Sequence, residues 1–203
     1  PLSHFSDVTN KFESIKEMHL FLYDDFFFLS NDLIHFTSLL FLFRPLINDS
    51  RKEGGTYFQN WYDVRYLSYA SVLHHAVYNF WDRIGDLIYS FLKTGLPEES
   101  VYVSRVLNNL PPVTKQSRYY IELNEMYVKQ VACLINDRNT DAHIKSFTTD
   151  SFYRIILAKG GDQATQTERK MSLPELFLEQ IEFAHKGFSL ALALIQDQGV
   201  PKS

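Results

Sequence analysis

The chain is poor in the residues that mark several classes of protein. Its 203 residues include one cysteine, Cys133, with eight glycines and seven prolines. This composition excludes a collagen-like chain and a disulfide-stapled secreted domain. Because a single cysteine cannot form a disulfide within the chain, we expect a reducing, cytoplasmic setting.

Basic charge is also scarce. Lysine and arginine number 20 against 24 aspartates and glutamates, which is a net charge of −4 at pH 7. A surface coated for nonspecific DNA binding is therefore not expected. A short basic cleft that binds RNA is compatible with this balance.

The chain lacks a long uninterrupted apolar run. The most apolar stretch, residues 20–43, is broken by five polar side chains: Asp24, Asp25, Asn31, Asp32 and His35. A bilayer span needs about 20 nearly uninterrupted apolar residues. We therefore expect this stretch in a protein core, with no membrane partner. We see no basic start followed by a small-residue cleavage site, so we expect no targeting segment.

Apolar and aromatic residues, in contrast, are plentiful, at 45% and 15% of the chain. They recur at steps of three and four, which is typical of helices, and no strand alternation is present. The expected helices are 5–20, 31–46, 59–92, 98–110, 117–136 and one beginning after Ser172. This pattern predicts an all-α fold, a single helical bundle with long antiparallel helices over residues 1–203.

The expected helix ends carry local signals. The helix 31–46 should end near Pro45, and Gly95 and Pro97 should follow the end of the helix 59–92. Ser172 and Glu175 have the spacing of a capping box. By composition, residues 48–56 and 159–170 are expected to be loops.

The most informative polar segment is 136–143, Asn-Asp-Arg-Asn-Thr-Asp-Ala-His. It follows an apolar helix, and continuing the stripe of that helix by four residues lands on Arg138. This position would face the protein interior, where a guanidinium is costly unless it meets an anion or lines a groove. Asn139 and its neighbours favour caps and turns, so a break would let His143 approach Arg138.

An arginine and a histidine brought together suit metal-free RNA cleavage. Arg138 would hold the phosphate, and His143 would take the proton of the 2′-OH that attacks the adjacent phosphorus. The expected products are a 2′,3′-cyclic phosphate and a 5′-OH. An Arg and a His five residues apart also occur by chance at polar helix ends, because the helix dipole favours both there. The spacing alone leaves this alternative open.

The pattern Arg138-Asn139-x-x-x-His143 in an all-α chain resembles the signature of the HEPN superfamily. The aromatic and polar segment 78–87 resembles the long helix that precedes this motif in the superfamily, and the resemblance covers roughly residues 60–195. It implies a core bundle over 60–195 and an N-terminal helical extension over 1–50. One departure is Lys145, where toxins paired with nucleotidyltransferase antitoxins usually carry a tyrosine; this weakens that particular pairing.

The resemblance implies a metal-independent endoribonuclease that works as a homodimer, with the two motifs facing each other across a cleft. Arg138 would contact the scissile phosphate, His143 would be the acid and base, and Asn139 would position the motif. A toxin or antiviral defence role, with an antitoxin or other protein partner, is also implied. The alternative is a catalytically inactive HEPN module that binds a nucleotide, RNA or a protein partner.

A second polar group lies on the long helix 59–92, where His75, Asn79, Asp82 and Asp86 are spaced by four, three and four residues. It is either a solvated face or a lining of the cleft, with Asp82 or Asp86 as orienting groups and Arg83 beside them. Of the neighbouring histidines His74 and His75, we expect one in the core and one at the surface rather than a pair of ligands.

Metal binding is the weaker reading of the remaining acids and histidines. Glu182-x-x-His185 occurs once, whereas a di-iron bundle needs a pair of such motifs. We therefore expect no metal and no cofactor. Cations that could line an RNA path are Arg83, Lys93, Arg105, Lys129, Arg138 and Lys145.

Overall fold

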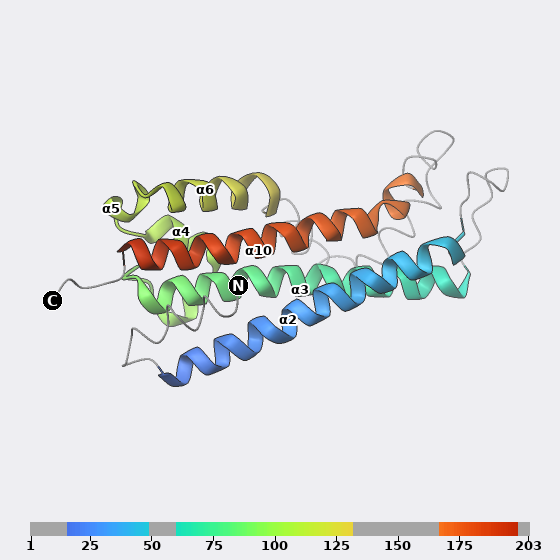
Figure 1. Cartoon of the computed structure of the whole chain (residues 1–203), viewed down its shortest axis with the longest axis horizontal. Helices are drawn as coiled ribbons and strands as arrows, with labels where there is room; N and C mark the ends of the chain where they lie inside the picture. The colour runs from blue at the N-terminus through green and yellow to red at the C-terminus, as the bar shows by residue number, and fades with distance from the viewer. Residues whose placement is uncertain (1–15, 49–59, 132–166, 199–203) are drawn as a thin grey trace. The chain divides into compact units, whose positions relative to one another are not determined.

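The computed structural model describes residues 16–48, 60–131 and 167–198, and the observations below concern these ranges (Figure 1). Within them every regular element is a helix and none is a strand, which confirms the all-α fold. The α-helices are α2 (Lys16–Phe43), α3 (Trp61–Phe91), α4 (Val103–Asn109), α5 (Pro112–Lys115), α6 (Arg118–Met126) and α10 (Leu173–Gln198). Two 3₁₀ turns, Arg44–Leu46 and Glu98–Ser100, and a π-helical turn, Tyr127–Val131, are also present. Residues 167–171 are helical as well.

The helix α2 corrects one prediction, because it runs unbroken where two separate helices were expected. No glycine or proline interrupts residues 16–43. Ser30 is accommodated within the helix because its hydroxyl donates to the Phe26 carbonyl oxygen at 2.6 Å. The helix ends at Phe43, and Pro45 lies in the 3₁₀ turn that follows, so the predicted end is confirmed. Residues 5–15 of the expected first helix lie outside the described residues.

The burial of α2 is narrower than the sequence predicts. Only a thin stripe is buried among its described side chains: Phe26, Leu33, Thr37 and Leu40. Phe28 and Leu42 are each 64% exposed. By length and composition, Tyr23–Leu46 could cross a membrane, with a mean hydropathy of 1.5, and 22% of its most apolar window is buried. The expectation of a core helix is correct for the stripe and wrong for the outer side of the helix.

The described residues fall into two compact units. Unit 1 contains 16–30, 77–131 and 182–198, and unit 2 contains 31–48, 60–76 and 167–181. Each unit takes residues from α2, α3 and α10. The single domain over 1–203 stays a prediction.

Aromatic packing forms the core of unit 1. The rings of Phe26, Phe80 and Phe188 meet with centroids 4.6–6.4 Å apart, and Trp81 packs on Tyr127 at 5.8 Å. Three large rings from three helices bury area that no single helix could bury alone. These contacts hold α2, α3 and α10 together within the unit.

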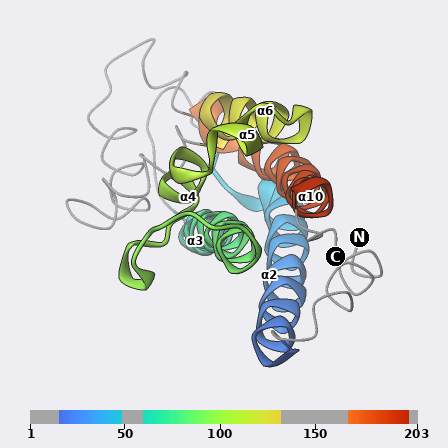
Figure 2. The same ribbon diagram turned by 90° about the vertical axis from the view of Figure 1, so that its left-hand side faces the viewer.

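The short helices of unit 1 attach to the long ones through polar contacts and a close backbone approach. Figures 1 and 2 show α6 alongside α10, where the Ser117 hydroxyl donates to Asp197 at 2.8 Å and Lys186 pairs with Glu122 at 2.6 Å. Figure 2 also shows α4 beside α3, where a Cβ on Gly85 would lie 2.8 Å from the Cα of Val103. Glycine is therefore needed at position 85.

Two predicted helices of unit 1 are modified. The expected helix 98–110 is divided by extended backbone at Tyr102 (φ −136°, ψ 154°), so that α4 begins only at Val103. The expected helix 117–136 is α6 followed by the π-helical turn Tyr127–Val131. Residues 132–136 of that helix lie outside the described residues.

In unit 2 the helices pack through a second set of rings. Tyr69 lies 5.8 Å from Phe36 and 5.3 Å from Phe43, and Phe43 lies 6.0 Å from Tyr62. Tyr66 and Phe177 are almost fully buried. These ring contacts hold α2 and α3 together within this unit.

Candidate functional site

The predicted catalytic residues lie beyond the part of the chain that can be described. Arg138, Asn139 and His143 fall in residues 132–166, outside the described residues. The last described element before them is the π-helical turn Tyr127–Val131. Their roles therefore stay predictions.

The supporting residues Asp82, Arg83 and Asp86 lie on α3 in unit 1. Arg83 donates to Asp86 at 2.7 Å and its Nε lies 3.5 Å from a carboxylate oxygen of Asp25. Its side chain is 41% exposed. Because two carboxylates already face this guanidinium, its charge is largely compensated.

The carboxyl group of Asp86 titrates abnormally. Burial raises its pKa above the ordinary value, and the negative charges of Asp82 and Asp25 add to this, while the Arg83 charge acts in the opposite direction. A carboxyl group that keeps its proton to higher pH can hold or give up a proton, so Asp86 has chemistry to offer beyond solvation.

The two neighbouring histidines divide as predicted. His74 is 2% exposed and belongs to the core, whereas His75 lies at the surface. Nδ1 of His75 lies 2.8 Å from the Ser71 carbonyl oxygen, which is the geometry of an Nδ1–H donor. Nε2 of His75 is then the ring nitrogen left to face solvent.

The cations proposed for an RNA path are partly engaged. Lys129 pairs with Glu125 at 3.2 Å, and the Arg105 guanidinium lies 5.1 Å from the ring centroid of Tyr102. In the described residues, no group of three or more histidines, cysteines or acids is placed to hold a metal ion. Glu182 and His185 are both exposed on α10.

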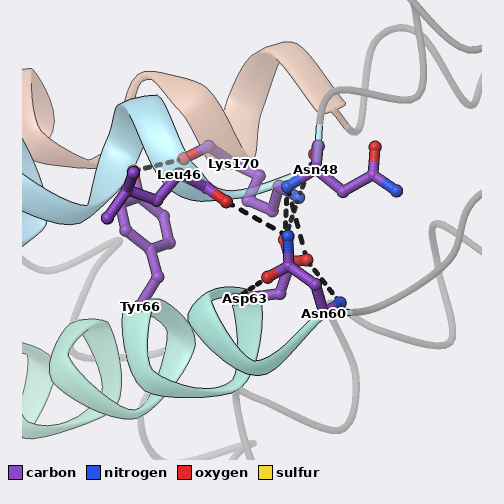
Figure 3. Close-up of polar contacts among 6 residues, drawn as sticks. All are labelled: Leu46, Asn48, Asn60, Asp63, Tyr66 and Lys170. Carbon is purple, nitrogen blue, oxygen red and sulfur yellow. Dashed lines mark hydrogen bonds and ion pairs between the residues drawn. The ribbon is translucent and has the colours of Figure 1, made fainter.

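The most elaborate polar cluster of the described residues lies in unit 2 and begins at the start of α3 (Figure 3). The Asp63 amide donates to the Asn60 side-chain oxygen at 2.9 Å, and the Asn60 amide donates to the Asp63 carboxylate at 2.8 Å. This reciprocal pair is a capping box. It satisfies two backbone N–H groups that the first turn of α3 would otherwise leave without partners.

The same Asp63 carboxylate meets Lys170. Lys170 Nζ donates to Asp63 Oδ1 at 2.8 Å and to the Asn48 carbonyl oxygen at 2.9 Å. The Asn48 amide approaches both carboxylate oxygens at 3.3 Å. The lysine side chain is 2% exposed and the aspartate side chain is fully buried, so this charge pair is closed to solvent.

Two further bonds complete the cluster. The Tyr66 hydroxyl donates to the Lys170 carbonyl oxygen at 2.8 Å, and the Asn60 side-chain amide donates to the Leu46 carbonyl oxygen at 3.1 Å. Burial raises the pKa of Tyr66 above its ordinary value. The cluster joins the segment after α2, the start of α3 and the segment before α10. The Asp63–Lys170 pair at its centre is closed to solvent, which favours a role in positioning these segments.

The sequence placed the capping box at the wrong helix. At α10 the Ser172 hydroxyl donates to the Arg169 carbonyl oxygen at 3.0 Å, and Glu175 pairs with Arg44. That pairing is the main cause that lowers the pKa of Glu175. The helix start at Leu173 is nevertheless predicted correctly.

Sequence reasoning also missed Lys170. It assigned residues 159–170 to a loop, but residues 167–170 are helical. The pattern Asn60-x-x-Asp63 before an apolar stripe was a usable signal for the α3 cap. No local signal marks Lys170 as the partner of Asp63.

Comparison of the chain with protein-family models, with curated proteins and with solved structures finds no match.

Proposed function

We propose that this chain is a metal-independent endoribonuclease of HEPN type. The observation that carries the proposal is the motif Arg138-Asn139-x-x-x-His143. The motif occurs in a chain whose described secondary-structure elements are all helices. The proposed reaction needs no metal ligands, because a histidine moves the proton and an arginine stabilises the negative charge on the phosphoryl group.

The proposed reaction is an internal transfer at one phosphodiester. His143 removes the proton of the 2′-OH, and the oxygen attacks the adjacent phosphorus. The bond from phosphorus to the 5′ oxygen breaks, and that oxygen takes up a proton. Arg138 compensates the additional negative charge on the phosphoryl oxygens. The products are a 2′,3′-cyclic phosphate and a 5′-OH, and DNA is not cleaved because it lacks the 2′-OH.

The supporting residues divide into two kinds. Arg83 already faces Asp86 and Asp25, which favours a structural role for its guanidinium. Asp86 has a raised pKa, which keeps it as a candidate orienting group together with Asp82. We assign the chemistry itself to Arg138 and His143, with Asn139 positioning them.

We further propose a homodimer in which two motifs share one cleft, with a toxin or antiviral defence role and an antitoxin or other protein as partner. A second candidate is a catalytically inactive HEPN module that binds a nucleotide, RNA or a protein. The excess of 24 acidic over 20 basic residues favours this candidate, since cleavage of RNA needs cationic surface along its path.

The test is RNA cleavage in EDTA with the full chain and with Arg138→Ala and His143→Ala. The matched controls are Arg118→Ala and His185→Ala, which remove one exposed arginine and one exposed histidine elsewhere on the chain. We expect cyclic-phosphate products from the wild type and both controls, and none from the two motif variants. No cleavage of diverse RNAs by the folded wild type would contradict the proposal and favour the binding module.

A further inference from the structure

The outer face of α3 in unit 2 carries an exposed tryptophan. Trp61, the first residue of the helix, is 65% exposed, whereas Tyr62 lies about 100° round the helix and packs on Phe43. The face continues with further exposed side chains: Val64, Arg65, Ser68, Val72 and His75. A tryptophan exposed to this degree is uncommon, because its burial is worth more than that of any other side chain.

Residues 60–76, which provide this face, contribute no exposed negative charge to it. Asp63 is the only acid among residues 60–76, and it is fully buried and paired with Lys170. Arg65 is the only cation in the same range and is exposed. The buried ion pair thus removes the one carboxylate from the surface, and the face is left with a single positive charge.

Arg65 lies directly over Trp61. Its guanidinium carbon is 4.9 Å from the centroid of the Trp61 ring, which is a cation–π contact. The guanidinium therefore covers one face of the indole. The ring, which is 65% exposed, has its other face left for a base, with a phosphate-binding group close by.

Other arginine and aromatic pairs of the described residues are less suited to an anion. Arg118 donates to the Tyr119 hydroxyl at 2.7 Å, and the charges of Asp197 and Glu122 act on it. Arg105 stacks on Tyr102, which follows Glu98 and Glu99 in the chain. In contrast, the part of α3 that carries Trp61 and Arg65 contributes no exposed carboxylate among residues 60–76, since Asp63 is buried.

We propose that this face of α3 binds single-stranded RNA, with one base stacked on Trp61 and an adjacent phosphate on Arg65. Aromatic platforms flanked by cations bind single strands with little sequence preference, because every base has a π face. His75 lies about 21 Å further along the helix at 1.5 Å per residue, and its exposed side chain extends the same face. The assignment of RNA as ligand rests on the proposed function.

The experiment uses the two tryptophans of the chain. Trp81 is fully buried and Trp61 is 65% exposed, so a base stacked on Trp61 quenches the red-shifted part of the emission. The His143→Ala chain in EDTA is titrated with an oligouridylate ten nucleotides long, by fluorescence and by anisotropy of labelled RNA. The variants Trp61→Ala, Trp61→Phe and Arg65→Ala are compared with Arg118→Ala as the matched control, because Arg118 is exposed and also stacks on an aromatic ring, that of Tyr119.

We expect Trp61→Ala to bind the RNA about 5- to 150-fold more weakly, since stacking on one aromatic is worth that factor. Trp61→Phe should recover part of the affinity, and Arg65→Ala should weaken both binding and its salt dependence. Arg118→Ala should bind as the parent does. Unchanged affinity in Trp61→Ala and Arg65→Ala, or no RNA binding by the parent, overturns the inference.

A protein partner is the other occupant that the test can reveal. If Trp61→Ala turns a dimer into a monomer in sedimentation while its RNA affinity is unchanged, the face is an interface between copies, and the RNA inference is wrong. The failures of the two proposals are distinguishable. Cleavage by wild type that is indifferent to Trp61→Ala overturns only the present inference, and Trp61-dependent binding without any cleavage overturns only the nuclease.

Discussion

Asp63 and Lys170 form a buried ion pair of 2.8 Å between residues 107 positions apart in the chain. Asp63 belongs to the first turn of α3, and Lys170 precedes α10. The pair therefore ties two segments of unit 2 that the sequence separates widely. The same carboxylate closes the α3 cap, so a local capping motif and a long-range contact depend on one side chain.

The first prediction concerns the loss of the buried cation. Lys170→Met should lower the free energy of unfolding by about 3–5 kcal/mol, because the Asp63 carboxylate is left buried without a compensating charge. The double variant Lys170→Met with Asp63→Asn should recover part of this loss. It removes the charge and keeps an oxygen that can accept from the Asn60 amide. Urea unfolding followed by circular dichroism measures both.

The matched control for that prediction is an exposed pair. Lys129 and Glu125 lie 3.2 Å apart, with side chains 67% and 60% exposed. Lys129→Met should change the free energy of unfolding by less than about 0.5 kcal/mol. Equal losses from Lys170→Met and Lys129→Met would show that burial of the Asp63 pair has no energetic consequence.

The second prediction compares the two possible helix caps. Asn60→Ala should lower the free energy of unfolding by about 1–2 kcal/mol, because it removes the acceptor for the Asp63 amide. Ser172→Ala should cost less than about 0.5 kcal/mol, since its exposed hydroxyl donates to a carbonyl oxygen and caps no N–H group. Urea unfolding measures both losses, and we expect the larger loss from Asn60→Ala. A larger loss from Ser172→Ala would support the cap at Ser172 that the sequence predicts.

The third prediction is a pH dependence that arises from Asp86. Its folded pKa is raised, chiefly by burial, so between the unfolded and the folded pKa the native state binds more protons than the unfolded state. The stability contributed by this group is therefore complete below the unfolded pKa and is lost as pH rises through the folded pKa. Asp86→Asn should remove that decline, which unfolding measured from pH 4 to pH 7 would detect. A wild type and an Asp86→Asn variant with parallel profiles would contradict the shift.

The fourth prediction concerns the close approach of α4 to α3. A Cβ at position 85 would lie 2.8 Å from the backbone N and Cα of Val103, and backbone atoms cannot turn aside as a side-chain end can. Gly85→Ala should therefore destabilise the protein by about 1–3 kcal/mol, even though alanine is the better helix former by about 1 kcal/mol. Ser68→Ala, at an exposed position of the same helix, should change stability by less than about 0.5 kcal/mol. A Gly85→Ala variant that is more stable than the wild type would contradict this close approach of α4 to α3.

Local patterns account for the parts of the fold that were predicted well. The bounds of α3 and the start of α10 follow from apolar spacing and from glycine and proline just beyond the helix. The division of His74 and His75 between core and surface follows from the same periodicity. Each of these features depends on residues within a few turns of one another, and their spacing is fixed by helix geometry.

The sequence by itself determined the helical class, the long helices α3 and α10, and the motif on which the proposed nuclease rests. The tertiary structure decided that Asp63 is buried against Lys170, that Glu175 pairs with Arg44 and that Gly85 must admit the backbone of α4. No periodicity links such partners, because they meet only when distant segments pack together. Whether a charged group stabilises or destabilises the folded state depends on that packing. A carboxylate costs little free energy in water and much when it is buried without a cation.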